Sequence, residues 1–188
     1  MGATIEFRFD EKKAAQAAAY LLRRHGGQMN YMMLIKLLYL SDRALFVKRG
    51  RSITGDMAFS MKHGPVLSRI MNFLKRDART SVPTVWTNHI SEPIGYDVKL
   101  LAESATDELS RTELKILETI DTQYGWMNEW DLVNLLHTIL PEPERPVESG
   151  RRPIIPDQIL RDERATDEEI DQIRQEIREL AAVDNLLR

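Results

Sequence analysis

The sequence predicts a mainly α-helical protein of the α+β class, a compact helical domain with a small antiparallel β-sheet or hairpin. Two observations predict this class. Apolar residues recur at helical spacing along most of the chain, whereas strict alternation of apolar and polar residues is confined to short stretches between positions 53 and 100. With 188 residues, 43% hydrophobic and 29% charged, the chain is expected to fold as one domain over 1–188.

Two helices are expected at the start of a core that spans 10–140. The first runs from Asp10, a suitable N-cap, to the glycine pair at 26–27. The second begins at Asn30 and reaches about Arg49. Apolar side chains nearly surround its axis, as is typical of a helix at the centre of a core. We therefore expect this helix to be the most buried element, with Leu37 and Leu38 inside.

The middle of the chain is expected to supply the β-structure and a third helix. Alternating apolar residues predict a short strand within 53–61. The pair Gly64-Pro65 is expected to open a helix, since proline suits the first helical position. Residues 84–90 and 94–100 are expected to form a β-hairpin.

The last third is expected to be helical on either side of a proline-rich connection. Ser110 and Glu113 form a capping box for one helix, and Asn128 begins another that carries Trp130 among its apolar residues. Residues 141–156 hold five of the eight prolines, which favours an extended connection. A final helix is expected over 166–182.

Several function classes lack support. The chain has no cysteine, which excludes disulfides and thiolate metal sites. The four histidines show no metal-ligand spacing, and P-loop, GxGxxG and GxSxG motifs are absent. No apolar stretch is long enough for a membrane span. We therefore expect a cytoplasmic protein with no metal.

The two halves of the chain differ in charge. Residues 1–100 hold 16 Lys and Arg against 8 Asp and Glu, whereas residues 101–188 hold 10 against 21. The basic half could meet an acidic partner or nucleic acid, or the halves could attract each other within one fold. The second interpretation is favoured.

Two groups of residues are candidates for binding. Lys62 and His63 precede the expected helix start at Gly64, so this point is either an anion-docking site or a tight turn. On the second helix, three polar residues share one face at i, i+3 and i+7, and form either a contact patch or the solvated side. They are Lys36, Tyr39 and Arg43.

Asp42 is expected to be partly buried on the central helix. A buried carboxylate needs a partner, and Arg49, Arg51 or Lys62 could supply one. The favoured interpretation is a structural ion pair, and the alternative is an acid in a cleft.

Three motifs, taken in order, resemble one known family. They are KLLYLSD at 36–42, GRSITGD at 50–56 and KHGPV at 62–66, followed by WDLVNLLH at 130–137. The set is similar to the Panacea domain, also called the SocA-like antitoxin domain, of phage-associated proteins. The resemblance implies the antitoxin of a type II toxin–antitoxin system, which neutralises a cognate protein toxin by direct binding. Some relatives resemble adaptors for a ClpXP-type protease. The resemblance implies no enzymatic activity, no catalytic residues and no cofactor.

The candidate partner-binding residues are taken from these motifs and from the two candidate binding groups described above. Two alternatives stay open: a nucleic-acid-binding regulator that uses the basic N-terminal half, and an enzyme that uses Asp42, Asp56 and His63. As a partner, nucleic acid is less favoured than a protein toxin. The candidates for contact with a toxin are Lys36, Tyr39, Arg43, Arg51, Asp56, Lys62 and His63.

Overall fold

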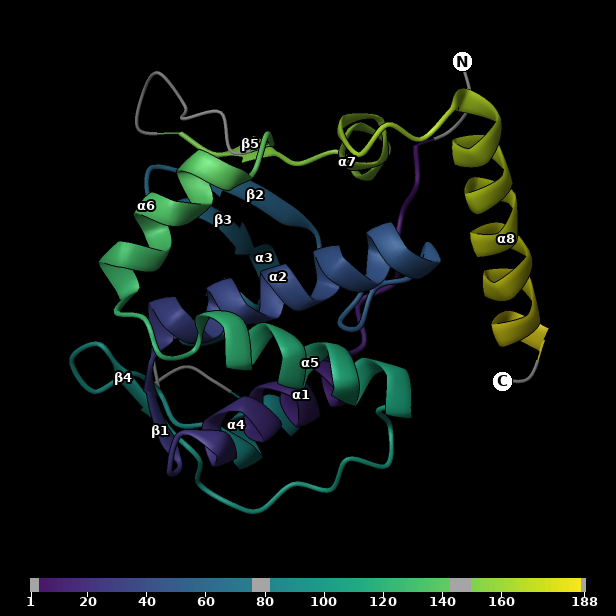
Figure 1. Cartoon of the computed structure of the whole chain (residues 1–188). Coiled ribbons are helices and arrows are strands. Elements are labelled where there is room, and N and C mark those ends of the chain that lie inside the picture. Colours follow the sequence, from purple (N-terminus) through teal and green to yellow (C-terminus); the bar gives the residue numbers. More distant parts are fainter. Residues whose placement is uncertain (1–3, 76–81, 143–149, 187–188) are drawn as a thin grey trace.

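The computed structural model describes residues 4–75, 82–142 and 150–186, and these residues form eight helices and five short strands (Figure 1). The predicted mainly α-helical α+β class is confirmed. None of the helices in these ranges has the length and apolar character needed to cross a membrane. The helices are α1 (Glu11–Arg24), α2 (Tyr31–Arg49), α3 (Ser68–Leu74), α4 (Val85–His89), α5 (Arg111–Tyr124), α6 (Glu129–Ile139), α7 (Pro156–Asp162) and α8 (Asp167–Leu186).

The strands form two small antiparallel sheets. β1 (Gln28–Asn30) pairs with β4 (Asp97–Lys99). The second sheet has the order β3-β2-β5, with β3 (Gly64–Leu67), β2 (Ala58–Met61) and β5 (Arg152–Pro153). β3 is therefore an edge strand, which is where a sheet accommodates a proline that has no N–H to donate.

Helix α2 runs through the middle of the fold, with α1 and α5 along one side and the β3-β2-β5 sheet along the other (Figure 1). Its residues from 33 to 42 are all buried, and Leu37 and Leu38 are 0% and 1% exposed. The predicted burial of both leucines is confirmed. Apolar side chains on most sides of the helix allow several elements to pack against it at once.

The helix caps predicted from the sequence are confirmed. The side chains of Asp10 and Asn30 accept hydrogen bonds from the first turns of α1 and α2, and Asn128 does the same for α6. Ser110 and Glu113 form the capping box of α5. These side chains bind N–H groups that the helices cannot satisfy internally.

The predicted start of the third helix is wrong. Gly64 and Pro65 belong to β3, and α3 begins at Ser68. Proline is favoured both at the first helical position and on a sheet edge, so its presence does not distinguish them. Lys62 and His63 therefore lie at the turn between β2 and β3 and not at the N-terminus of α3.

The predicted hairpin over 84–90 and 94–100 is wrong in its first strand. Val85–His89 form α4, and β4 pairs with β1. The apolar residues Trp86 and Ile90 are spaced by four, and both are 1% exposed. Trp86 lies within α4, whereas Ile90 is the C-cap and has an extended backbone. Thr84 and Thr87 complete a capping box at the start of the helix. One isolated bridge, between Ile90 and Leu100, joins the two stretches.

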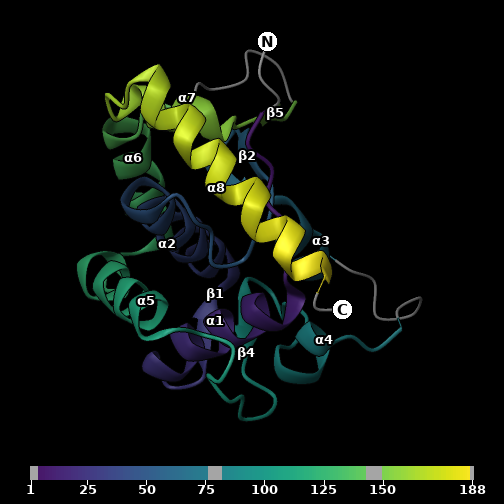
Figure 2. The same cartoon turned by 90° about the vertical axis from the view of Figure 1, so that its right-hand side faces the viewer.

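The proline-rich stretch 141–156 is only partly extended, and 143–149 lies outside the described residues. It contains β5 and ends at α7, a helix that the sequence analysis missed and that has Pro156 in its first turn. The following helix α8 lies diagonally along one side of the molecule (Figure 2). Asp157 of α7 accepts a hydrogen bond from the Ile5 amide at 3.0 Å and forms an ion pair with Arg174 of α8. This carboxylate thus ties the N-terminal segment to both C-terminal helices.

Basic residues of the first half form ion pairs with acidic residues of the second half within the fold. Five basic residues from the first hundred form ion pairs with acidic residues from the last 88, which supports attraction between the halves. Most of these pairs join α1 to α5 or to the segment before it, so they bridge elements distant in sequence. The pairs are Lys12–Glu108, Lys13–Glu113, Arg23–Glu103, Arg24–Asp121 and Arg43–Glu142.

Candidate functional site

Asp42 of α2 holds the loop that follows the helix. Its Oδ1 accepts hydrogen bonds from the amides of Ile53 and Thr54 at 2.7 and 2.9 Å, and its Oδ2 accepts one from the Thr54 hydroxyl. Burial raises the pKa of Asp42 to about 6, although the bonds from Thr54 and Ile53 act in the opposite direction. The predicted structural ion pair with a basic residue is replaced by contacts with the loop itself.

Asp56 ends the same loop and caps α3. Its carboxylate accepts hydrogen bonds from the amides of Arg69 and Ile70 at 2.8 and 3.0 Å. Burial raises the pKa of Asp56. The chain's own carboxylate therefore occupies the helix N-terminus at which the sequence analysis placed an anion-docking point.

A glycine between these two carboxylates allows the N-terminal segment to cross the loop. Gly55 has φ +66°, and a Cβ at this position would lie 2.0 Å from the Arg8 carbonyl oxygen. The Asp10 amide donates to the Thr54 carbonyl at 2.8 Å nearby. The GRSITGD motif is therefore a structural element that joins α2, α3 and the N-terminal segment.

Tyr39 and Arg43 share a face of α2, as predicted, and both contact Glu142. The Tyr39 hydroxyl donates to Glu142 at 2.7 Å, and Arg43 binds Glu142 and reaches Glu163 at 2.8 Å. Burial and the neighbouring Glu142 raise the pKa of Tyr39 well above its ordinary value. Because Tyr39 is 2% exposed, this face of α2 is neither solvated nor an open contact patch at that residue.

Lys36 is also in the interior. Its side chain is fully buried, and Nζ donates to the Pro65 carbonyl of β3 at 2.9 Å. Burial lowers the pKa of Lys36 to about 7, because a charged ammonium is poorly solvated in the core. Gly64 has φ +83°, and a Cβ there would lie 3.4 Å from Nζ, so the glycine leaves room for the ammonium group.

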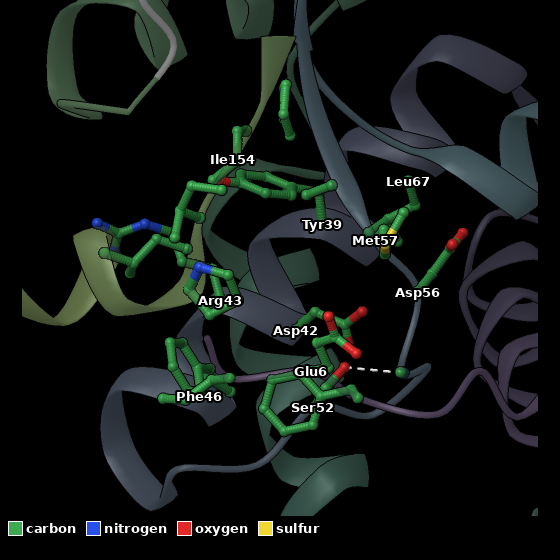
Figure 3. Close-up of a pocket in the computed structure, with 18 of the residues that line it drawn as sticks. Glu6, Tyr39, Asp42, Arg43, Phe46, Ser52, Asp56, Met57, Leu67 and Ile154 are labelled. Atoms are coloured by element: carbon green, nitrogen blue, oxygen red, sulfur yellow. Dashed lines mark hydrogen bonds between the residues drawn. The ribbon is translucent and has the colours of Figure 1, made fainter. Parts of the chain in front are cut away.

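A cavity of about 370 Å³ opens beside this face of α2 (Figure 3). Tyr39, Asp42, Arg43 and Phe46 of α2 form one wall, and residues 52–59 form another. The N-terminal segment 4–7 and the β5–α7 segment 153–159 complete it. Three of the seven candidates, Tyr39, Arg43 and Asp56, thus meet at one cavity, which they share with Asp42.

Lys62 and His63 form part of a different surface. Both are exposed at the β2–β3 turn, and the His63 ring meets the ring of Trp130 edge-on, with centroids 5.2 Å apart. Trp130 is 51% exposed, and Trp126, four residues earlier, is 78% exposed. We call Lys62, His63 and Trp130, together with the exposed Trp126 that precedes α6 in the sequence, the tryptophan face. Arg51, the remaining candidate, is exposed in the loop after α2.

The predicted triad of Asp42, Asp56 and His63 does not form one site, since the two carboxylates line the cavity and His63 packs on Trp130. Within the residues that the structure describes, no three His, Cys, Asp or Glu side chains are arranged to hold a metal ion.

The sequence analysis missed the exposure of Trp130. It grouped this residue with the apolar side chains of its helix, yet Leu132, Val133 and Leu136 form the buried stripe of α6. Trp130 lies outside that stripe because, at about 100° per residue, it is rotated by roughly 110° from the centre of the stripe. A helical-wheel comparison restricted to α6 would have identified it.

Comparisons with known proteins place this arrangement in a family. No curated protein and no solved structure matches the chain. The model of the family described as "Antitoxin SocA-like, Panacea domain" matches residues 34–139, which run from α2 to the end of α6. This confirms the resemblance of the ordered motifs. Since the match covers more than half of the 188 residues, the chain belongs to the SocA-like Panacea antitoxin family.

Proposed function

We propose that this protein is a non-catalytic antitoxin that neutralises a cognate protein toxin by binding it directly through the tryptophan face. Family membership supports a protein partner, and the exposure of Trp126 and Trp130 is the observation that carries the choice of surface. Tryptophan is enriched among the residues that dominate binding energy at protein interfaces. The two solvent-exposed indole side chains are therefore suitable anchors for a partner.

Both indoles are held in place before any partner arrives. Trp130 packs against His63, and Trp126 Nε1 donates to the Gln123 carbonyl at 2.9 Å. Ordered side chains lose little rotamer freedom on association, which favours affinity. Lys62 adds a positive charge to the face, whereas Glu129 and Asp131, on either side of Trp130 in the sequence, add negative charge.

The experiment is co-expression with the toxin encoded next to this protein. The double variant Trp126→Ser/Trp130→Ser should fold normally, lose rescue of growth, and bind purified toxin at least 100-fold more weakly by calorimetry, roughly the effect of losing interface hot spots. Tyr96→Ser is the matched control, because Tyr96 is 68% exposed and also stacks on another ring, that of Tyr31. Unchanged affinity in the double variant would contradict the proposed surface.

The mode of neutralisation is tested in the same cells. Occlusion of the toxin predicts that toxin levels stay constant while growth is rescued. Delivery to a ClpXP-type protease predicts instead that toxin levels fall and that rescue is lost in cells without the protease. Salt-dependent binding of DNA by the isolated protein would favour the regulator alternative. Five of the basic residues that would have to contact phosphates are in ion pairs within the fold.

A further inference from the structure

The cavity beside α2 is not used by the proposed contact with a toxin. Its volume of about 370 Å³ lies within the range of small-molecule sites, roughly 300–1,000 Å³. Much of its wall is apolar and includes Phe46, Leu67 and Ile154. A wall of this kind suits a small organic molecule better than a bare ion.

The charges in the wall are unbalanced. Asp42 is buried there, and its hydrogen bonds come from the amides and hydroxyl of the following loop. Across the ranges 4–75, 82–142 and 150–186, no lysine or arginine forms an ion pair with it. A buried carboxylate without a counter-ion is costly to keep charged. An incoming cation would remove that cost.

The other charged groups of the wall increase the imbalance. Glu6 and Asp56 add two carboxylates, and Asp56 is occupied in capping α3. The arginine of the wall, Arg43, is already bound by Glu142 and Glu163. The lining therefore attracts positive charge and repels anions.

We propose that this cavity binds a small organic cation, an amine with an aromatic or aliphatic body, whose ammonium group lies beside Asp42 while its body packs against the apolar wall. Figure 3 shows the labelled side chains of Asp42 and Phe46 on this wall. Two of the four walls, residues 4–7 and 153–159, lie outside the stretch matched by the family model. The residue proposed to bind the ammonium, Asp42, thus lies within the family match, whereas part of the wall around the ligand's body comes from outside it.

The experiment titrates the full chain with 2-phenylethylamine, using calorimetry and amide NMR spectra. Its uncharged analogue 2-phenylethanol is the comparison ligand. The amine should bind saturably and about tenfold more tightly than the alcohol, since a charge-assisted hydrogen bond is stronger than a neutral one. Bound amine should shift the amides of 52–59 and slow hydrogen exchange at the Ile5 amide, which is bonded to Asp157.

Two variants test separately the contribution of the Asp42 charge and that of the cavity volume. Asp42→Asn should weaken amine binding about tenfold and leave alcohol binding unchanged. Ala58→Leu places a larger side chain in the wall and should weaken the binding of both the amine and the alcohol. This variant tests the cavity even if Asp42→Asn does not fold. Asp131→Asn on the exposed surface of α6 is the matched control and should change neither.

Three outcomes would overturn the proposal. They are equal affinities for amine and alcohol, amide shifts outside the cavity, and no saturable binding of the amine at millimolar concentration. A folded Asp42→Asn variant that binds the amine as the unaltered protein does would also overturn it, and would leave Asp42 with its structural role at the loop.

Discussion

The interior face of α2 and the tryptophan face both lie within the family match, but the fold treats their polar groups in opposite ways. Lys36 and Asp42 are buried, and each binds backbone groups of a neighbouring segment. Lys62, His63 and Trp130 are open to solvent, and the turn that carries the first two is packed against a ring of α6. The first region builds the fold, and the second has surface available for a partner.

This difference shows that the most regular part of a motif need not be the part that binds. The run 36–42 carries much of the resemblance, yet its charged residues are closed off from any protein partner by burial. Side chains that serve the fold must keep their spacing to reach fixed backbone partners. Burial rather than motif membership separates the two regions, since Lys62, His63 and Trp130 also belong to motifs that carry the resemblance.

The comparison predicts its largest effect at the centre of α2. Leu37→Ala should lower the free energy of unfolding by about 2–5 kcal/mol, because a fully buried leucine leaves a cavity among the packed helices. Urea denaturation followed by circular dichroism measures it. Leu186→Ala, at a position that is 85% exposed, is the control and should change little. Equal losses in both variants would contradict the central role of α2.

A pH series tests the burial of Lys36. Its pKa is lowered from 10.5 to about 7 in the fold, so between these values the unfolded chain binds more protons and stability rises with pH. Between about pH 7.5 and about pH 9.5, the free energy of unfolding should therefore rise by about 2 kcal/mol relative to Lys36→Met. Exposed Lys62→Met should follow the unaltered protein. Parallel pH profiles for Lys36→Met and the unaltered protein would show that Lys36 does not titrate in this range.

A smaller effect is expected at the cap of α3. Asp56→Ala should cost about 1 kcal/mol of unfolding free energy, because two amides of the first turn lose their acceptor. Asp56→Asn keeps an acceptor oxygen and should retain most of the stability. Thermal melts of the two variants, recorded side by side, measure the difference. If Ala and Asn melt together below the unaltered protein, the charge of Asp56 matters and not its capping bond.

The smallest effect on stability is expected on the tryptophan face. Lys62→Glu should change the free energy of unfolding by no more than about 0.5 kcal/mol, as is usual for exposed side chains, while weakening rescue from the toxin. Arg51→Glu should behave in the same way if the loop after α2 contributes to the contact. Growth assays and melting temperatures of both variants provide the two readouts. If a variant loses both its stability and its ability to rescue growth, the residue has a structural role in the fold.

Much of the helical framework could be predicted because it depends on local chemistry. The caps at Asp10 and Ser110 and the apolar surface of α2 follow from neighbouring residues alone. The errors at Pro65 and over 84–90 arose where the same residues suit two local structures and a distant partner decides. β3 is set by its pairing with β2, and β4 by its pairing with β1.

The candidate site was less predictable for the same reason. Helical spacing correctly placed Tyr39 and Arg43 on one face, but their shared partner Glu142 lies 99 residues beyond Arg43. The cavity depends on segments 4–7 and 153–159, which only tertiary packing brings together. Asp42 has its partners 11 and 12 residues away in the following loop, so periodicity within one helix could not reveal them.

The bond between the Ile5 amide and Asp157 also has a consequence for the order of events during synthesis. The two residues are 152 positions apart, and a ribosome that adds roughly 5–20 residues per second needs on the order of 10–30 s to cover that distance. During that interval α1, α2 and α5 can assemble through their ion pairs. Segment 4–7 still lacks the Asp157 carboxylate that binds the Ile5 amide. The Ile5–Asp157 bond therefore becomes available only after the helices and strands up to β5 have been synthesised.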